Sequence, residues 1–279
     1  MPTPAPLLLP LQQSSEYAAT LRLLGREVLC LRTEVPLRLV RRRFGPIPVT
    51  YLPRGALACA DRKSLIRALP LCHLRLIIPE SPEDAGRLRR AIPVLTPQYV
   101  AEWALPPEGV PALWQGLHGK WRNRLRRAME AQAEVAIRPF DPLRHAPLLA
   151  REAAQRQQRR YRALPSSFVA AFARANPGQT RMIEARQDGQ VIAFVLLLLH
   201  PPVATYLISW TGAAGRDIHA HNRLLWEAAC WLSAEGFQRF DLGGLETDAN
   251  PSLARFKLGT GAKPRPLGPT LVLPPGLPA

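Results

Sequence analysis

The sequence predicts an α/β (α+β) protein in which two similar blocks follow each other along the chain. Short apolar runs, which are typical of buried strands, alternate with segments of helical periodicity. The chain has 279 residues, of which 47% are hydrophobic, so it can bury two cores of moderate size. We therefore expect a folded protein of two domains rather than a disordered chain.

The first block begins with a helix and continues with strands. Gly25 ends the first helix, and a Pro-Arg-Gly turn, Pro53 to Gly55, ends a hairpin-like return. The expected elements are a helix over 16–24, a strand over 27–32, a return over 46–52, a helix over 61–69 and a strand over 74–79. Their strands are too apolar to be exposed on both faces.

A basic helix follows a loop over 106–111 and closes the first domain, which we place at residues 1–133. We expect this helix over 112–132 because apolar residues recur at helical spacing. The apolar stripe is Trp121, Leu125, Ala128 and Met129; Arg122, Arg126 and Arg127 lie beside it, and Lys120 and Arg124 lie opposite. The helix should therefore present a cationic surface.

The second domain, placed at residues 134–264, repeats the alternation with a longer run of strands. The Asp188-Gly189 pair predicts a tight hairpin, and Gly236 ends a long helix. The expected order is a strand over 134–138, helices over 141–160 and 166–175, strands over 181–186, 190–200 and 203–210, a helix over 220–235 and a strand over 237–242. A Pro-rich tail, 265–279, is expected to return to the first domain through its apolar piece, 270–273.

The end of the last strand and the helix that follows it form the most informative segment. The strand ends in Asp241 and a Gly-Gly pair, and a short helix begins with Asn250 at the cap and Pro251 at its first position. Lys257 lies in the last turn of this helix. A carboxylate and an ammonium at the carboxyl end of a strand, beside glycines that let a ligand approach, are typical of a site. A structural joint with a surface lysine is the alternative.

The element order of the second block is that of the N-acetyltransferase-like (GNAT) fold, in which two strands splay and leave a gap for the acyl donor. Four segments resemble the FemABX-like family, the aminoacyl-tRNA-dependent transferases that build peptidoglycan cross-bridges. They are the opening helix over 13–25, VTYLPRG over 49–55, KWRNRLRRA over 120–128, and DLGG over 241–244 followed by Phe256, Lys257 and Gly261. The resemblance implies two tandem GNAT-like acyltransferase domains, the N-terminal one degenerate, and aminoacyl transfer to an amine of a peptidoglycan precursor or another peptide.

The resemblance also assigns roles to residues near the splay. Aminoacyl transfer from an ester to an amine requires that the reactants are held together, the amine is deprotonated and the oxyanion is stabilised. Lys257 is expected to supply positive charge near the oxyanion, and Phe256 to pack against the donor. Asp241 is the candidate that orients Lys257 or accepts a proton; a salt bridge that fixes the loop is the alternative.

The acceptor is expected to contact residues of both blocks. By resemblance, Arg22 and Arg54 lie on a face that meets a phosphate-bearing acceptor, and arginine forks suit phosphates and carboxylates. Bonding of Arg54 to turn carbonyls is the alternative. Tyr206 and Trp210, on the strand beside the splay, are candidates for lining the acceptor channel, and an ordinary place in the core is the alternative.

The net charge of +16 and the pI of about 11.0 make the chain a strong polycation. Such proteins commonly bind nucleic acid, anionic lipid or phosphate-bearing substrates. We expect the basic helix to bind tRNA in a salt-dependent manner through Lys120, Arg122, Arg126 and Arg127. An arginine run over 156–162 is a second candidate, a solvated face is the alternative for both, and peripheral contact with an anionic membrane also fits the charge.

The segment that would hold the phosphates of acetyl-CoA reads Arg216 to His221. A helix N-terminus and glycines normally cradle such phosphates, and here both glycine positions are histidines, His219 and His221, which are expected to crowd the site. We therefore expect aminoacyl-tRNA as the donor and no cofactor. An acyl-CoA-dependent N-acyltransferase and a non-catalytic RNA-binding module are the alternatives. A metal pair is not favoured, because no carboxylate or Cys lies at ligand spacing.

The four cysteines show neither a CxxC pair nor zinc spacing, so we expect buried, reduced thiols. The N-terminus has no basic leader, and the longest apolar run, 191–199, is far shorter than the roughly 20 residues of a membrane span. These features predict a cytoplasmic protein.

Overall fold

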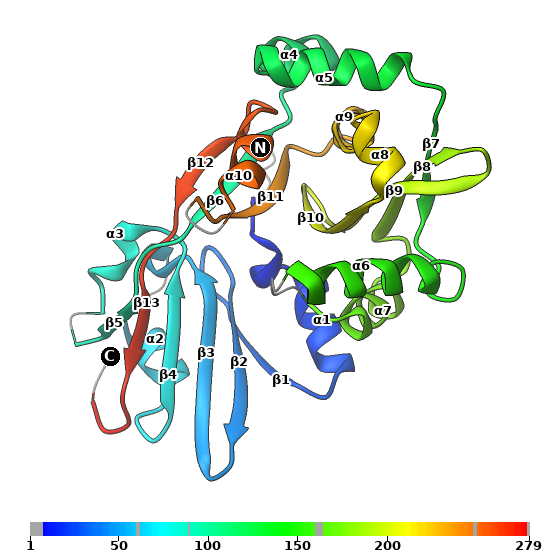
Figure 1. Cartoon of the computed structure of the whole chain (residues 1–279). Coiled ribbons are helices and arrows are strands. Elements are labelled where there is room, and N and C mark those ends of the chain that lie inside the picture. The colour runs from blue at the N-terminus through cyan, green and yellow to red at the C-terminus, as the bar shows by residue number, and fades with distance from the viewer. Residues whose placement is uncertain (1–7, 60–61, 89, 160–163, 248–249, 278–279) are drawn as a thin grey trace, which may run out of the picture. The chain divides into compact units, whose positions relative to one another are not determined.

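The computed structural model describes residues 8–59, 62–88, 90–159, 164–247 and 250–277 (Figure 1). The chain divides into two compact units. Unit 1 contains the chain up to Val100, Gly244–Glu246 and the tail from Pro264; unit 2 contains Ala101–Gly243 and Thr247–Lys263. The tail thus lies in unit 1, and the basic helix lies in unit 2.

Unit 1 is built on a six-stranded sheet with the strand order β1-β2-β3-β4-β13-β5. The predicted elements up to β4 are present in the predicted order, but strand β2, the short helices η1, η2 and α3, and strand β5 were not predicted. Residue 61, where the second helix was expected to begin, lies outside the described residues. The elements are η1 (Leu11–Gln13), α1 (Ser15–Leu23), β1 (Glu27–Leu31), β2 (Leu37–Phe44), β3 (Ile47–Gly55), η2 (Leu57–Cys59), α2 (Arg62–Ala68), β4 (Leu74–Pro79), α3 (Pro82–Ala85), β5 (Ile92–Leu95) and β13 (Thr270–Leu273).

The return predicted over 46–52 is the second strand of the β2–β3 hairpin. Phe44 pairs with Ile47 across a Gly45-Pro46 turn, and Gly45 has a φ of 56°. β3 then runs parallel to β4 through five registered pairs, from Val49 with Leu74 to Gly55 with Pro79. The parallel pair is therefore joined over most of its length.

The C-terminal tail completes the sheet of unit 1. β13 lies between β4 and β5 and is antiparallel to both. Leu271 and Leu273 are buried in the same apolar core as the strands β2, β3 and β4. The fully buried Arg75 of β4 donates Nη2 to the carbonyl of Leu277 at 2.7 Å and also to that of Pro274. Burial lowers the pKa of Arg75, and these carbonyls replace part of its hydration.

Unit 2 is built on a seven-stranded sheet with the order β12-β6-β11-β10-β9-β8-β7. Strands β6, β11 and β12 contain residues of both units. The elements are β6 (Tyr99–Ala104), α4 (Val110–Gly116), α5 (Gly119–Glu130), β7 (Glu134–Pro139), α6 (Ala146–Arg159), α7 (Ser166–Ala175), β8 (Thr180–Gln187), β9 (Gln190–His200), β10 (Val203–Thr211), α8 (Ala213–Asp217), α9 (Ala220–Ala234), β11 (Arg239–Leu245), α10 (Pro251–Leu258) and β12 (Lys263–Pro266).

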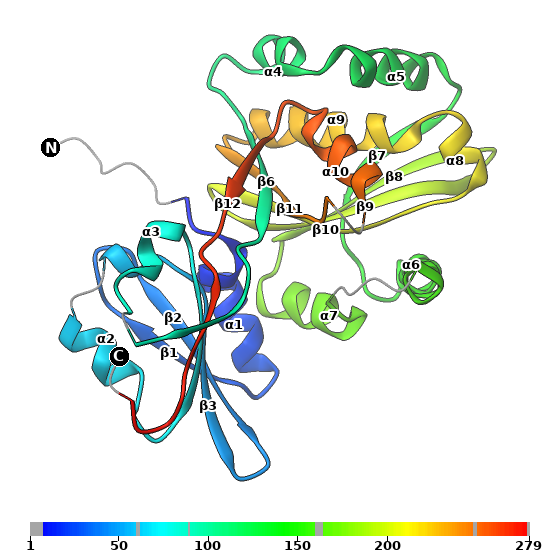
Figure 2. The same ribbon diagram turned by 60° about the vertical axis from the view of Figure 1, so that its left-hand side comes forward.

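Helices cover both faces of this sheet, with α9 on one face and α6 and α7 on the other (Figure 2). The central strand β9 is buried along nearly its whole length because it is covered twice. The predicted Asp-Gly turn joins β8 to β9, with a φ of 49° at Asp188 and 74° at Gly189. The sequence had predicted β7 to β11 and the helices α6, α7 and α9 in this order; it had not predicted β6, α8 or β12.

The basic helix differs from its prediction in two respects. The chain does not form one helix over 112–132 but two, α4 and α5, because Leu117 and His118 are extended between them. Trp121, Leu125 and Ala128 are buried as expected, but Met129 is 40% exposed and lies outside the apolar stripe. The stripe is thus shorter than predicted.

The expectation of buried thiols was wrong for two of the cysteines, since Cys30 and Cys72 are exposed. Cys30 faces outward on the edge strand β1, and Cys72 lies in the turn before β4. None of the helices in the described ranges combines the length and apolarity required to cross a bilayer.

Candidate active site

The predicted splay is present between β10 and β11. The two strands are parallel but pair through only three residues, from Val203 with Arg239 to Thr205 with Asp241. Immediately after Thr205, β10 has a bulge between Tyr206 and Ile208 in its pairing with β9. The pairing of β10 with β11 therefore ends at Asp241, next to the bulge in β10.

Asp241 and Lys257 both lie at the end of this paired stretch. Asp241 is 2% exposed and Lys257 6% exposed. The Asp241 carboxylate accepts a hydrogen bond from the Gly243 backbone at 2.8 Å. Gly243 has a φ of 78°, and a Cβ added there would stand 3.8 Å from Lys257 Nζ. The ammonium thus lies against a backbone position without a side chain, two residues after Asp241, close to where Asp241 leaves the sheet as the sequence predicted.

Helix α10 places Lys257 through the caps read from the sequence. The Asn250 side chain accepts a hydrogen bond from the Leu253 backbone at 3.2 Å, and Pro251 occupies the first position. Gly259 caps the carboxyl end, but with an ordinary right-handed φ of −63°; the left-handed glycine is Gly261, at 91°. Gly259 is required for a different reason, because a Cβ there would lie 2.6 Å from the Trp121 ring.

Phe256, one residue before Lys257, connects α10 to the long helix α9. Its ring lies 5.2 Å from the His221 ring in an edge-to-face arrangement and 6.1 Å from the Trp121 ring of α5. Phe256 is half-buried. It therefore contacts aromatic rings of both α5 and α9.

His221 belongs to a polar cluster on the α9 face of β10. Its Nε2 lies 3.2 Å from the Tyr206 hydroxyl and its Nδ1 lies 2.9 Å from the Thr211 hydroxyl. The Tyr206 hydroxyl also bonds the Ser209 hydroxyl. Burial lowers the pKa of His221 to about 4 and raises the pKa of Tyr206 to about 12, so both groups are neutral near pH 7.

Tyr206 and Trp210 do not share a face, although both had been predicted to line one channel. The bulge shifts the alternation, so Tyr206 faces α9, whereas Trp210 stacks on Phe194 with ring centroids 6.4 Å apart. The guanidinium of Arg151, on α6, lies 5.4 Å from the Trp210 ring. The half-buried Trp210 therefore contacts Phe194 of β9 and Arg151 of α6.

A groove between α5 and α10 lies beside Phe256. Its volume is about 550 Å³. Trp121, Phe256 and Leu258 form an apolar floor, and Lys120, Arg124 and Arg255 supply cationic side chains. All three cationic residues are exposed. A groove of this size, with an aromatic floor and a basic rim, suits a ligand that combines a ring with phosphates.

The other predicted RNA-binding arginines of α5 are arranged differently. Arg122 donates Nη2 to the carbonyl of Leu117 at 2.9 Å, and it lies 5.7 Å from the Trp114 ring. Arg126 lies 5.6 Å from the same ring. Arg122 and Arg126 therefore support the α4–α5 junction, whereas Lys120 faces the groove and Arg127 is exposed.

The segment before α9 does not crowd a phosphate site in the way the sequence suggested. His221 turns inward to Tyr206 and Thr211, so only His219 remains at the loop. His219 has a left-handed φ of 53°, which is the conformation a glycine would supply. Burial lowers the pKa of His219, and nearby Arg124 and Arg127 lower it further. The steric argument against acyl-CoA is therefore weaker than expected.

The two candidate acceptor arginines lie in unit 1 and differ in their surroundings. Arg54 is 6% exposed and forms a two-bond ion pair with Glu80, at 3.0 Å from Nε and 3.2 Å from Nη2. Arg265 approaches the same carboxylate at 2.5 Å. Arg22 is exposed and donates Nη2 to the carbonyl of Val28 at 3.3 Å. Arg54 thus has a structural partner, the carboxylate of Glu80, in addition to its predicted role toward the acceptor.

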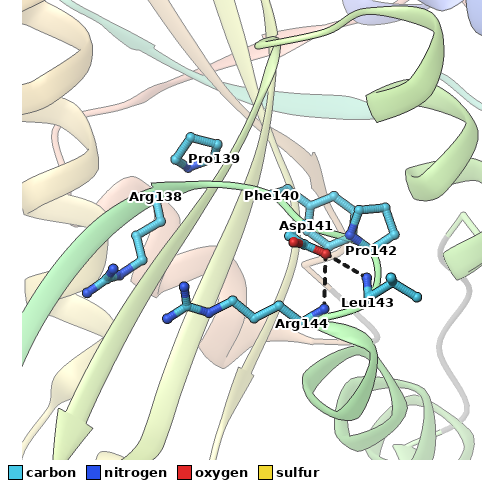
Figure 3. Close-up of a pocket in the computed structure, with 7 residues that line it drawn as sticks. All are labelled: Arg138, Pro139, Phe140, Asp141, Pro142, Leu143 and Arg144. Atoms are coloured by element: carbon cyan, nitrogen blue, oxygen red, sulfur yellow. Dashed lines mark hydrogen bonds between the residues drawn. The ribbon is translucent and has the colours of Figure 1, made fainter.

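A second hollow, of about 710 Å³, lies on the surface where β7 leads into α6 (Figure 3). Asp141 accepts hydrogen bonds from the backbones of Leu143 at 2.8 Å and Arg144 at 3.0 Å, and these bonds lower the pKa of its carboxyl. Every lining residue except Phe140 is exposed. This hollow includes none of the predicted site residues.

A family model described as acetyltransferase (GNAT) domain matches residues 119–258, half of the chain. The chain belongs to this family. The match covers the splay, the α5–α10 groove and Lys257, so the candidate site lies inside the family's own domain. GNAT proteins with this domain are acyltransferases, and the chain is one of them. No curated protein matches the sequence closely.

Solved structures confirm the predicted fold of two tandem GNAT-like domains. FemX is 11% identical, with a TM-score of 0.74 over 94% of this chain and 92% of FemX. A putative lysylphosphatidylglycerol synthetase domain from Agrobacterium fabrum is 14% identical, with a TM-score of 0.56 over 94% of this chain and 87% of that chain. A tandem GNAT protein from the clavulanic acid biosynthesis pathway is 15% identical, with a TM-score of 0.54 over 89% and 82%.

Several residues of this GNAT site had not been predicted from the sequence. His221 had been considered only as an obstacle to phosphate, and Thr211, Ser209 and Arg255 had not been considered at all. Their sequence signals are weak, because single hydroxyls and a helical arginine occur everywhere on protein surfaces. In the described part of the chain, no three His, Cys, Asp or Glu residues gather as metal ligands would.

Proposed function

We propose that this GNAT-family acyltransferase moves an amino acid from a charged tRNA to an amine of a peptide acceptor, and that the acceptor is a peptidoglycan precursor. The observation that carries the proposal is the buried Lys257 beside Gly243 and Asp241, adjacent to a groove with an aromatic floor and a basic rim. FemX shares the fold over most of both chains, which supports an aminoacyl donor.

The proposed reaction is an acyl transfer from an ester to an amine. The acceptor amine attacks the ester carbonyl carbon, and the carbonyl oxygen becomes negatively charged. Collapse of this intermediate forms the amide, releases the terminal ribose hydroxyl of the tRNA, and moves one proton from the amine to that leaving oxygen. We assign Lys257 to the stabilisation of the oxyanion, because a buried ammonium acts more strongly than one in water.

Asp241 is assigned to orienting this site or to receiving the amine proton during transfer. Its carboxylate is already oriented by the Gly243 backbone at 2.8 Å. Phe256 is assigned to packing against the donor end. The groove residues Lys120 and Arg124 are assigned to phosphates of the tRNA end, in an electrostatic interaction that depends on salt. We place this reaction in the cytoplasm, where charged tRNA is available.

An acyl-CoA-dependent transferase is the second candidate. The left-handed His219 and the inward-turned His221 favour it, because they keep a glycine-like backbone at the start of α9. The two donors can be compared directly. Purified protein is incubated with peptide amine acceptors and either a charged-tRNA mixture or acetyl-CoA, and products are identified by mass spectrometry.

Under the proposal, only the tRNA mixture gives a product heavier by an aminoacyl residue. Calorimetry should then detect no micromolar binding of acetyl-CoA. Acetylated acceptor together with micromolar acetyl-CoA binding would replace the first proposal by the second. Salt-sensitive tRNA binding without any product would instead support the RNA-binding module.

A further inference from the structure

The tip of the β2–β3 hairpin extends beyond the rest of the unit 1 sheet. β1 pairs with β2 only as far as Glu27 with Arg41, and β4 pairs with β3 only from Leu74 with Val49. Residues 42–48 therefore pair only within the hairpin, with no third strand beside them among the described residues, and both views show the hairpin protruding (Figures 1 and 2). At about 3.4 Å per residue, the tip projects by about 10 Å.

Two large apolar side chains are exposed at the end of this hairpin. Phe44 is 63% exposed and Ile47 is 49% exposed. They are a directly opposed pair in the β2–β3 register, so both project from the same face of the ribbon. A phenyl ring and a branched aliphatic side chain presented together at a projecting turn are typical of an interaction surface.

Arginines surround this apolar pair. Arg41, Arg42 and Arg43 precede Phe44, and the last two are exposed. Arg41 forms a 3.0 Å ion pair with Glu27, whose side chain is itself 64% exposed. The segments at this end of the sheet, residues 22–27 and 41–48, contain five arginines and one acidic residue, Glu27. The hairpin end of this sheet is therefore strongly positive.

A second pair of exposed apolar residues lies near the same end of the sheet. Leu23 is 44% exposed and Leu24 is 41% exposed, at the end of α1. The turn that follows leads into Glu27, which is registered with Arg41. The apolar and cationic character thus continues from the hairpin to the α1–β1 turn.

We propose that the hairpin tip, residues 41–48, attaches unit 1 to anionic lipid bilayers. Phe44 and Ile47 enter the boundary between headgroups and acyl chains, while Arg42 and Arg43 bind lipid phosphates. The projection of about 10 Å matches the roughly 5–10 Å depth at which interfacial segments reside. This attachment is independent of the donor and the acceptor used at the transferase site.

The chemistry of the tip favours a bilayer over other partners. RNA would gain from arginines and from stacking on Phe44, but Ile47 offers no π-face to a base. A second copy of the chain would bring two clusters of arginines together, which is unfavourable. An anionic bilayer accepts the aromatic, the aliphatic and the cationic groups at once.

The test is co-sedimentation of the full chain with vesicles of phosphatidylcholine, with and without phosphatidylglycerol as a minority lipid. The hairpin variants are R42Q/R43Q and F44S/I47S. The matched controls lie on the exposed β7–α6 surface of Figure 3: R138Q/R144Q removes the same charge, and L143S removes an apolar side chain that is 89% exposed. Thermal unfolding verifies that each variant remains folded.

We expect binding to phosphatidylglycerol-containing vesicles only. R42Q/R43Q should weaken it by about 30-fold, since each arginine near an anionic surface contributes about 5-fold. F44S/I47S should weaken it by about 10-fold even at high salt, because apolar insertion is not screened. The control variants R138Q/R144Q and L143S should each change the affinity for these vesicles by less than about 3-fold.

Three results would overturn the proposal. The first is the absence of vesicle binding by the unmodified chain. The second is an equal loss in R42Q/R43Q and R138Q/R144Q, which would show that net charge, not the hairpin, drives binding. The third is unchanged vesicle binding in both hairpin variants together with weakened tRNA binding in R42Q/R43Q, which would make the hairpin an RNA contact.

Discussion

The two sheets share a motif, a parallel strand pair whose connection contains helices, but they use it differently. In unit 1, β3 and β4 pair through four consecutive positions and, after an irregularity between Leu52 and Gly55, again at Gly55 with Pro79. In unit 2, β10 and β11 pair through three positions and then separate. The pairing in unit 1 thus resumes at the end of β4, whereas the pairing in unit 2 stops at Asp241.

The charged residues at the two strand ends follow the same division. Unit 1 places Arg54 and Arg265 on one carboxylate, Glu80, and its backbone closes the end further through a 2.9 Å bond from Glu80 to Gly55. Unit 2 places Lys257 beside the bare backbone of Gly243. In unit 1 the charged residues thus form ion pairs with one another. In unit 2 a buried lysine, Lys257, lies where the pairing of the strands ends.

The largest expected effect tests the reaction centre of unit 2. If Lys257 stabilises the oxyanion, Lys257→Met should lower turnover by about 10²–10³ while folding and tRNA affinity barely change. Lys257→Arg should recover activity in part, since it restores the charge without the compact geometry. The exposed Lys263 provides the control, Lys263→Met, which should retain full turnover. Full activity in Lys257→Met would remove the residue from the mechanism.

The next effect tests the ion pairs that Glu80 forms with Arg54 and Arg265 in unit 1. Glu80→Gln removes the countercharge of two arginines, one of them 7% exposed, so the free energy of unfolding should fall by about 2–3 kcal/mol. Urea denaturation measures this loss. At saturating substrate, the folded variant should retain its turnover. A raised KM for the acceptor in both Glu80→Gln and Arg54→Lys, without loss of stability, would instead restore Arg54 to the predicted acceptor site.

A third effect concerns the polar cluster beside the splay. Burial lowers the pKa of His221 to about 4. Because the unfolded chain binds this proton first, stability should be fully present above pH 6.5 and should decrease as pH falls toward 4, by about 2 kcal/mol at pH 5. The slope of the urea midpoint against pH should be shallower in His221→Asn than in the unmodified chain. Thr211→Val, which keeps the imidazole, should lower stability but retain the slope; equal slopes in all three proteins would contradict the assignment.

The sequence predicted the elements around the splay well, because their signals are local. Asn250 and Pro251 specify the start of α10, the Asp188-Gly189 pair specifies a hairpin, and apolar runs specify the buried strands. Lys257 and Asp241 came together as predicted because one joint carries both. Long-range contacts had no such signal. The pairing of Arg54 with Glu80 and the inward turn of His221 depend on partners 26 and 15 residues away, respectively.

The fourth effect separates the groove of unit 2 from the rest of its basic helix. Lys120→Gln with Arg124→Gln removes two groove cations, so tRNA affinity should fall by about 10-fold and the slope of log affinity against log salt should flatten by about 2. Arg122→Gln with Arg126→Gln alters residues that contact Trp114, so it should flatten the slope less and lower stability more. Filter binding at several salt concentrations measures both. The opposite ranking would assign the RNA to the Trp114 side of α5.

The smallest effect tests whether the absence of a side chain at Gly243 in unit 2 is required for turnover or only for folding. Gly243 and Gly236 have nearly the same φ, 78° and 79°, so alanine should destabilise either position by about 1 kcal/mol. A Cβ at Gly236 has open space around it, whereas a Cβ at Gly243 faces Lys257 Nζ at 3.8 Å. Urea denaturation should therefore show similar losses in the two variants, and only Gly243→Ala should lose turnover beyond its loss of folded protein. Equal turnover would show that the space beside Lys257 is not used by the substrate, because the two substitutions differ only in what the new methyl group meets.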